Sequence, residues 1–321
     1  MKKIALVAAL AAASAAPAAF AQGSVTLWGR LNTSIESQKT GNGDRIAVVQ
    51  NNASRLGFRG VEDLGGGLKA GFNLEHGLNS DTGAASGGTT FWSRESTVWI
   101  SSAELGTIRL GSSFPDSYFA TVDRTSNHNH DTGTSSDALF SAIGFGYTTN
   151  KATYITPDMG GFQAYISAMA GEGTRPRAYD LAANYTVGTL HIGAGYTQAD
   201  AGFGSPKRDN AIIEADYGFG PFLVTGYLQT EKVDGFRTRN IARVSGMYTM
   251  GASEFHLNVG GTKSGGDGTF RNAGASQWTL AYNYNLSKRT KVYVFYTDID
   301  QKLPNHAGDF NSLAAGVRHN F

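Results

Sequence analysis

The chain has 321 residues with 27 basic and 26 acidic side chains, and it contains no cysteine. The near balance of charge gives no basic surface for nucleic acid, and the missing thiols exclude disulfides, thiolate metal sites and cysteine nucleophiles. The 42 Gly and 7 Pro residues suit a β protein with many tight strand ends.

The first residues have the order of a secretory signal peptide. Lys2 and Lys3 precede an apolar stretch that ends in small residues just before Gln22, and this order is typical of a cleaved export signal. We therefore expect residues 1–21 to be removed and residues 22–321 to form a single domain. Cleavage takes Lys2 and Lys3 from the 27 basic residues and leaves 25 against 26 acidic ones.

After this segment, apolar and polar residues alternate in many short stretches. In the first stretch Val25, Leu27, Leu31 and Ile35 share one parity, and polar residues such as Arg30 share the other. A period of two predicts strands with one apolar and one polar face. The same alternation returns in the stretches that begin at Leu68, Phe162, Leu190, Phe255 and Trp278.

Two kinds of connection alternate between these strands. Short ones such as Asp158–Gly161 and Gly218–Pro221 are followed by longer polar ones such as Ser37–Asn52 and Leu78–Thr90. Short turns at one end and long loops at the other are the plan of outer-membrane barrels, which also have an even number of strands, here about sixteen. The predicted fold class is an all-β, transmembrane antiparallel β-barrel with no helix-period segment.

A soluble β-sandwich has the same alternation and is the alternative to this fold. The apolar faces, however, often end in an aromatic residue, as at Tyr196, Tyr284 and Tyr296, where the girdles of a membrane barrel lie. Closure of about sixteen strands also leaves a lumen wide enough for water. The sequence therefore favours a pore.

One segment, residues 112–147, departs from the regular plan. It is too long for an ordinary surface loop, and it carries Asp116 and Asp123 together with aromatic residues such as Phe114 and Tyr118. We expect the aromatic residues to hold this segment against a wall. The segment is then predicted to fold into the lumen and narrow it.

Five blocks of the sequence resemble one family. They are SVTLWGRLN (residues 24–32), SRLGFRGVEDLGGGLKAGF (residues 54–72), LGTIRLG (residues 105–111), the stretch 154–162 and the ending GVRHNF. Together they resemble the general diffusion porins of the beta-proteobacterial type, over essentially the whole mature chain. The resemblance implies a homotrimer of sixteen-stranded barrels in the bacterial outer membrane, each with its third external loop folded inward as a constriction.

The resemblance also implies a set of pore-lining charges. In the family a ladder of basic wall residues faces acidic residues of the inward loop, and Arg55 and Arg94 stand at matching wall positions. With the other basic residues of inward parity, the expected lining is Arg30, Arg55, Arg59, Lys69, Arg94, Arg109, Asp116 and Asp123. The chain departs from the family at Ser112 and near Tyr147, where basic residues are common, so the ion preference stays open.

In the strand around Arg94, either Arg94 or Glu95 could face the lumen. Arg94 shares the parity of Val98 and Ile100, so it would face lipid unless a bulge intervenes, and Glu95 is the alternative. A lipid-facing Arg at the midplane costs about 2–4 kcal/mol in barrels. We therefore expect a bulge or an interfacial position at Arg94, and the resemblance implies that its side chain reaches the lumen.

The expected function is passive diffusion of ions and small hydrophilic solutes, with no cofactor, metal or catalytic residue. Besides its own copies, the expected partners are outer-membrane lipid and lipopolysaccharide, and an assembly machinery that reads the terminal Phe321. A substrate-preferring channel of the same fold and, from another class, an outer-membrane barrel enzyme are the alternatives.

Two motifs could support other chemistry. The triplets Asp81-Thr82-Gly83 and Asp131-Thr132-Gly133 match those of aspartic proteases, but polar residues precede both, so turns in loops explain them better. His128, His130 and Asp131 carry atoms that bind divalent metals. Without further partners, this spacing is more typical of a solvated loop.

Overall fold

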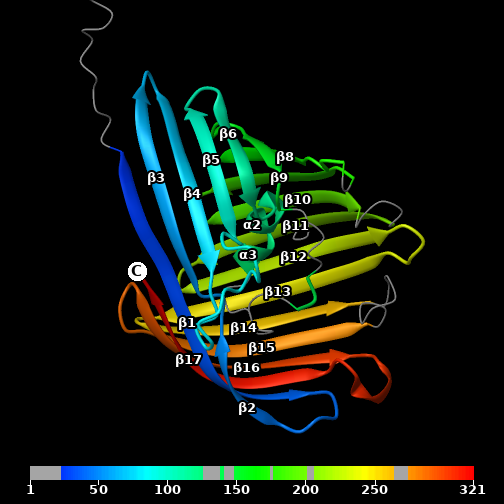
Figure 1. The fold of residues 1–321 in the computed structure, drawn as a ribbon. Coiled ribbons are helices and arrows are strands. Elements are labelled where there is room, and N and C mark those ends of the chain that lie inside the picture. The colour runs from blue at the N-terminus through cyan, green and yellow to red at the C-terminus, as the bar shows by residue number, and fades with distance from the viewer. Residues whose placement is uncertain (1–22, 126–137, 141–147, 174–175, 201–205, 264–273) are drawn as a thin grey trace, which may run out of the picture.

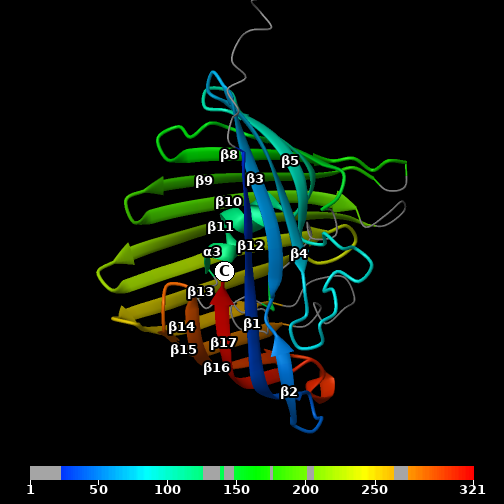
Figure 2. The same cartoon turned by 60° about the vertical axis from the view of Figure 1, so that its left-hand side comes forward.

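The computed structural model describes residues 23–125, 138–140, 148–173, 176–200, 206–263 and 274–321. Within these residues seventeen strands form one sheet of antiparallel pairs that closes between β1 and β17 (Figures 1 and 2). The strands are β1 (Ser24–Thr40), β2 (Ile46–Asn51), β3 (Arg55–Gly65), β4 (Leu68–Gly77), β5 (Glu95–Ser102), β6 (Gly106–Ser113), β7 (Lys151–Ile155), β8 (Phe162–Met169), β9 (Ala178–Val187), β10 (Leu190–Asp200), β11 (Lys207–Phe219), β12 (Phe222–Val233), β13 (Arg239–Met250), β14 (Ser253–Thr262), β15 (Ala275–Asn285), β16 (Thr290–Gln301) and β17 (Phe310–Asn320).

Strands β2 and β3 together occupy one position in the barrel. Both pair with β1, β2 along Thr33–Gln38 and β3 along Ser24–Arg30. The break between them contains Ala53, whose φ of 54° lies in the left-handed region. The barrel therefore has sixteen strand positions, which confirms the predicted fold class.

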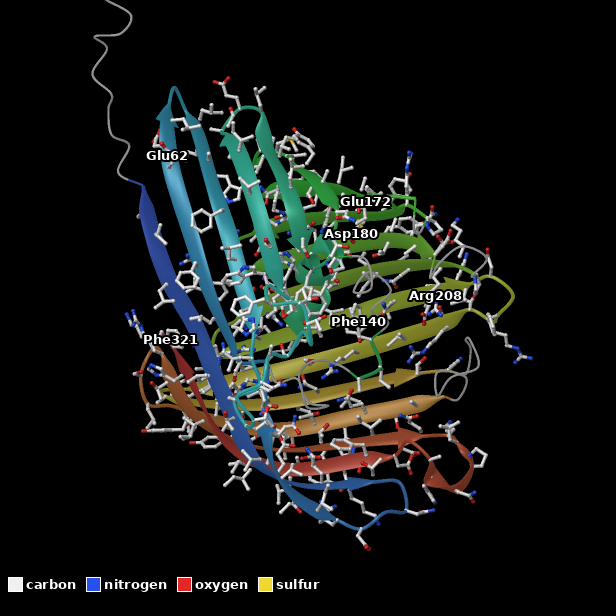
Figure 3. The ribbon with its side chains drawn as sticks, viewed as in Figure 1. Glu62, Phe140, Glu172, Asp180, Arg208 and Phe321 are labelled. Carbon is white, nitrogen blue, oxygen red and sulfur yellow. The ribbon has the colours of Figure 1, made fainter. Side chains whose placement is uncertain are left out.

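The barrel closes where the two ends of the described chain meet. Gly29 and Phe321 exchange two backbone hydrogen bonds, of 3.0 and 3.1 Å, and Figure 3 shows Phe321 at the end of β17 beside β1. This pairing leaves neither strand as an open edge, as a bilayer requires.

The alternation of the sequence separates the two faces of the wall. On β1, Leu27, Leu31 and Ile35 are 54, 46 and 69 % exposed on the outer face, whereas Asn32 and Glu36 are buried on the inner face. An apolar outer band and a polar interior are the arrangement of a membrane barrel, since the outer side chains contact hydrocarbon. The apolar outer face and the polar inner face predicted from the period of two are confirmed.

One predicted loop is wrong. Residues Ser37–Asn52 were expected as a long polar connection, but β1 runs to Thr40 and β2 begins at Ile46, so the loop is residues 41–45. The polar residues from Ser37 to Thr40 belong to β1, and Gln50 and Asn51 belong to β2. The expected short turns at Gly218–Pro221 and Asp158–Gly161 are present, with two residues between β11 and β12 and six between β7 and β8.

Two short helices interrupt the strands where no helical period was found. They are α2 (Asp116–Ala120) and α3 (Val122–Thr125), and a 3-10 turn, η3 (Pro304–His306), lies before β17. At five and four residues, α2 and α3 are too short for an apolar period to show. No helix in the described part of the chain has the length and apolar character needed to cross a bilayer.

Candidate functional site

The segment that contains α2 and α3 lies inside the barrel (Figures 1 and 2). α2 contacts β9 and β10, and α3 contacts β11, β12 and β13. Val122 packs with Leu139, Ile212, Tyr227 and Ile241 in a buried apolar cluster. The inward-folded loop predicted for residues 112–147 is therefore present in its described residues from Phe114 on, because β6 runs to Ser113. Residues 126–137 and 141–147 lie outside the described part of the chain.

Asp180 on β9 holds the start of α2. Its Oδ2 accepts hydrogen bonds from the backbone N–H groups of Asp116, at 2.7 Å, and Ser117, at 3.4 Å. Figure 3 shows Asp180 at the level of these helices. Because amides at a helix start have no partner within the helix, a carboxylate satisfies them.

Asp116 is the second anchor of the loop. Its two carboxylate oxygens accept from Arg109 Nη2, at 2.6 Å, and from Lys151 Nζ, at 2.9 Å, and Ser167 Oγ donates at 3.1 Å. Burial alone would raise the pKa of Asp116, but the charges of Lys151 and Arg109 outweigh burial and hold that pKa below 3.8. The carboxylate therefore stays ionised and keeps α2 on the wall.

Two glycines of β10 make room for α2. A Cβ atom at Gly193 would overlap the carbonyl oxygen of Ala120, and one at Gly195 would overlap Ser117. Both glycines have inward parity, because His191 and Thr197 on the same strand are buried on the inner face. The wall is thus flat where the loop rests on it.

On the far side of the loop, the lumen contains a cavity of about 580 Å³. Its charged side chains among the described residues are those of Arg30, Arg55, Arg94 and Arg318, with one acidic side chain, that of Asp123. The inward loop contributes an aromatic wall of Phe114, Tyr118, Phe119 and Phe140. The cavity is therefore predominantly basic on the barrel side and aromatic on the loop side.

The break between β2 and β3 positions two of these arginines. The carbonyl oxygen of Ala53 accepts from Arg30 Nη2, at 2.9 Å, and from Arg55 Nε, at 3.3 Å. In a regular strand this carbonyl would accept a backbone hydrogen bond from the neighbouring strand. The break instead directs it at the guanidinium groups and fixes their position.

Arg94 is the residue before β5, and its side chain enters the lumen. It therefore escapes the parity of Val98 and Ile100, because the strand begins only at Glu95. Its Nε lies 2.5 Å from Glu75 Oε1, and its guanidinium lies 4.8 Å from the centre of the Phe114 ring. Glu95 also faces inward, opposite Glu75 in the register of β4 and β5.

Glu75 is shared between two arginines. Its Oε1 lies 3.2 Å from Arg55 Nη1 as well as 2.5 Å from Arg94 Nε. One negative charge thus faces two positive charges. This group of three retains a net positive charge beside the cavity.

The structure brings together only part of the predicted lining. Arg30, Arg55, Arg94 and Asp123 meet at the cavity, whereas Arg109 and Asp116 pair with each other between loop and wall. Arg59 and Lys69 are exposed on β3 and β4, and they lie outside the cavity lining.

Three further residues of this site, Lys151, Asp180 and Arg318, were not predicted from the sequence. Lys151 and Asp180 each stand at inward parity on their strands, so the alternation with their neighbours was an available signal. Arg318 lies within the block GVRHNF that carried the resemblance. No local pattern indicates that the first two contact the inward loop, since their partners are 35 and 64 residues away.

Comparison with known proteins agrees with this geometry. A family model described as Gram-negative porin matches residues 5–303. The chain is 33 % identical to outer membrane porin protein 32 of Delftia acidovorans, over 89 % of this chain and 86 % of that protein. It is 25 % identical to an outer membrane porin protein of Bordetella pertussis, over the full length of both.

Solved structures have the same fold. An anion-selective porin from Comamonas acidovorans superposes with a TM-score of 0.76 at 28 % identity, covering 93 % of this chain and all of that one. The trimer form of OmpT of Vibrio cholerae gives 0.67 at 15 % identity, covering 93 % and 99 %. The second likeness concerns the fold alone.

Proposed function

We propose that this chain, which belongs to the Gram-negative porin family and is a diffusion channel of the bacterial outer membrane, prefers anions to cations. The residues that set this preference are Arg30, Arg55, Arg94 and Arg318. The observation that carries the proposal is the charge of the cavity beside the inward loop, where four arginine side chains and one acidic side chain lie among the described residues.

Charge at the narrowest part of a pore determines ion preference, because the low-dielectric wall focuses the field there. The formal charge of the whole chain is only +1, so the overall composition has little influence. Glu75 offsets one of the charges of Arg55 and Arg94, which leaves the wall positive. Chloride is then enriched in the constriction relative to potassium.

Asp123 has a separate role on the loop side of the cavity. It belongs to α3, opposite the arginines of the barrel wall among the cavity-lining residues. Opposed charges produce a field across the pore, which orients water and leads anions along the wall. Asp123 therefore leaves a path for cations along the loop side of the cavity.

The remaining predicted residues act around this constriction. Arg109 and Asp116 position the loop through their ion pair of 2.6 Å. Lys69 follows the turn at residues 66–67, and Arg59 lies in the middle of β3. Both are exposed outside the cavity lining, so in this proposal neither sets the ion preference. All solutes pass by diffusion, without a saturable binding step.

The assembly completes the proposal. A relative of the same fold, OmpT of Vibrio cholerae, has a trimer form, and we propose a homotrimer here as well. Residues 1–21 are the export signal in this account, residues 22–321 form the barrel, and Phe321 is the residue read during insertion. Outer-membrane lipid and lipopolysaccharide contact the apolar outer band.

Charge reversal tests the ion preference. Arg55→Glu and Arg94→Glu, singly and together, should move the reversal potential in a KCl gradient toward cation preference. Arg59→Glu is the matched control, because it makes the same charge change on the same barrel outside the cavity lining. Equal shifts in the three single variants would show that the cavity does not control selectivity.

A further inference from the structure

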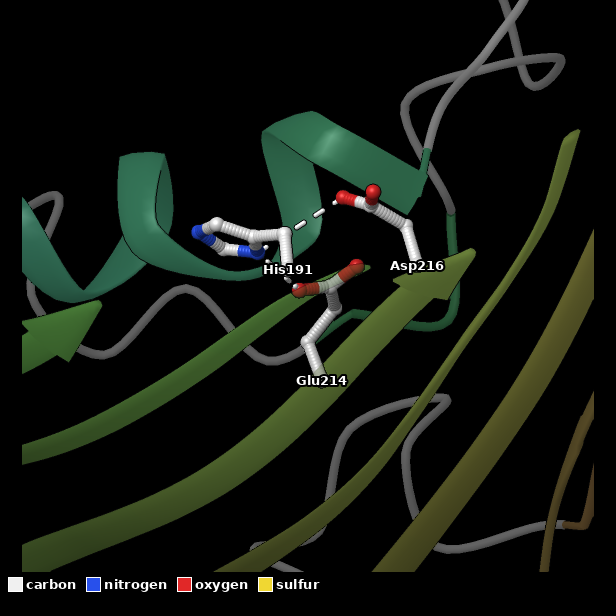
Figure 4. A group of neighbouring side chains, drawn as sticks. All are labelled: His191, Glu214 and Asp216. Carbon is white, nitrogen blue, oxygen red and sulfur yellow. Dashed lines mark hydrogen bonds and ion pairs between the residues drawn. The ribbon is translucent and has the colours of Figure 1, made fainter. Parts of the chain in front are cut away.

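A separate group of side chains lies under the inward loop, in the half of the barrel near the short turns. His191 is the second residue of β10, and Glu214 and Asp216 are on β11, with His191 directly opposite Asp216 in the register. All three are buried, and Figure 4 shows them converging beside the helices of the loop. None of them lines the arginine cavity.

The distances between these groups match those of a metal site. His191 Nδ1 lies 3.1 Å from Glu214 Oε2 and 3.6 Å from Asp216 Oδ2, and the potential ligand atoms all lie within 4.8 Å of one another. In a tetrahedral Zn²⁺ site, bonds of about 2.0–2.2 Å place neighbouring ligand atoms about 3.3 Å apart. The three side chains therefore need only small movements to share one ion.

The orientation of the imidazole provides a second observation. The other ring nitrogen, His191 Nε2, lies 3.3 Å from Asn184 Oδ1, an oxygen that can only accept hydrogen bonds. When Nε2 carries the proton and donates to this amide, Nδ1 presents a lone pair to the two carboxylates. A metal-binding histidine is held in this way by an outer partner.

Glu214 provides a third observation. Its side chain is 0 % exposed, and its Oε1 has no hydrogen-bond partner within the described part of the chain. A buried carboxylate oxygen without a partner is costly. A cation bound between the carboxylates would compensate this charge.

We infer that His191, Glu214 and Asp216 form a binding site for a divalent transition metal such as Zn²⁺. An imidazole with two carboxylates is a donor set that suits zinc, and three protein ligands leave a fourth position for water. This inference concerns the wall beneath the loop and does not depend on the ion preference proposed above.

Arg124 of α3 competes with the metal. Its Nε lies 2.6 Å from Asp216 Oδ2, and its side chain is 41 % exposed. The same oxygen serves the metal, so metal binding releases the guanidinium from Asp216 into the lumen. The metal thus couples the wall to the inward loop and adds positive charge near the constriction.

Calorimetric titration of ZnCl₂ into the folded, chelator-treated protein in detergent tests the site. We expect one Zn²⁺ per chain. His191→Asn should weaken binding about 100-fold, because it removes a ligand and even an outer partner is worth about 10–100-fold. Glu214→Gln should also weaken it, and Asn184→Ala by about tenfold.

Arg124→Gln gives the opposite expectation. Removing the competing guanidinium should tighten zinc binding by about fivefold, which corresponds to about one partly exposed ion pair. A zinc ion bound elsewhere would respond to neither change. Opposite shifts in His191→Asn and Arg124→Gln therefore identify this site specifically.

His306→Asn is the matched control, because His306 is an exposed histidine 2.8 Å from one carboxylate, Asp309. It should leave the titration unchanged, as should the double variant His128→Asn and His130→Asn in the part of the loop outside the described residues. Each variant is first checked for folding by its heat-modifiable mobility in gels. Absence of zinc binding by the parent, or full binding by a folded His191→Asn variant, would overturn the inference.

Discussion

Lys151 Nζ lies 2.9 Å from Asp116 Oδ2 and thereby joins β7 to the first residue of the inward helix α2. Both side chains are almost fully buried, at 2 and 6 % exposure. In such surroundings the loss of one partner leaves an uncompensated charge. This pair is therefore a buried electrostatic attachment of the loop that shapes the pore.

Asp116→Asn should detach the loop. Removing one partner of a buried ion pair costs about 3–5 kcal/mol, and here Arg109 loses its partner as well. We expect a lower unfolding temperature and a larger, noisier single-channel conductance. The control is Lys207→Met, which breaks an exposed pair of 3.6 Å and should change neither quantity, because such pairs contribute little.

The coupling of the two residues is measurable. Lys151→Met and Asp116→Asn disrupt the same contact, so the double variant should lose less stability than the sum of the single variants. Thermal or urea unfolding of the three proteins gives the interaction energy. Strict additivity would show that the two residues stabilise the fold independently.

The contribution of Asp116 to stability should be lost only at low pH. The pKa of Asp116 in the folded protein lies below its ordinary 3.8, so its contribution to stability is complete above 3.8 and disappears as pH falls through the lower folded value. We expect the difference in unfolding free energy between the parent and Asp116→Asn to be constant from pH 7 to 5 and to shrink below 3.8. A difference already lost at pH 5 would contradict the assignment.

Gly195→Val should push α2 away from the wall. A side chain here overlaps Ser117, so the helix must move into the lumen and the single-channel conductance should fall. Gly246→Val is the control, because a Cβ at Gly246 meets no atom within 4 Å. Equal conductance in Gly195→Val and the parent would mean that the wall tolerates the added volume.

The alternation of the sequence predicted most of the barrel, because within each strand successive side chains face lipid and lumen in turn. The period of two around Leu27 and Leu31 is imposed by the bilayer, whatever the distant contacts are. The break at Ala53 and the helices α2 and α3 were not predicted, because they are short and carry no period. Arg94 was ambiguous because parity applies only within a strand, and β5 begins one residue later.

The site was less predictable than the fold because it depends on contacts between distant residues. Asp116 and Asp123 are seven residues apart and were expected to act together, but one is held on the wall and the other lines the cavity. Which side of the loop each carboxylate faces is decided by Lys151, Asp180 and the flat surface at Gly193. These partners meet Asp116 and α2 only in the folded barrel.

The reversal potential of the parent protein in a planar bilayer, under a tenfold KCl gradient, tests the central claim most directly. The basic lining of Arg30, Arg55, Arg94 and Arg318 predicts ohmic steps and a reversal potential with the sign of chloride preference, whose size decreases at high salt as the charges are screened. A reversal potential with the sign of potassium preference would contradict the account.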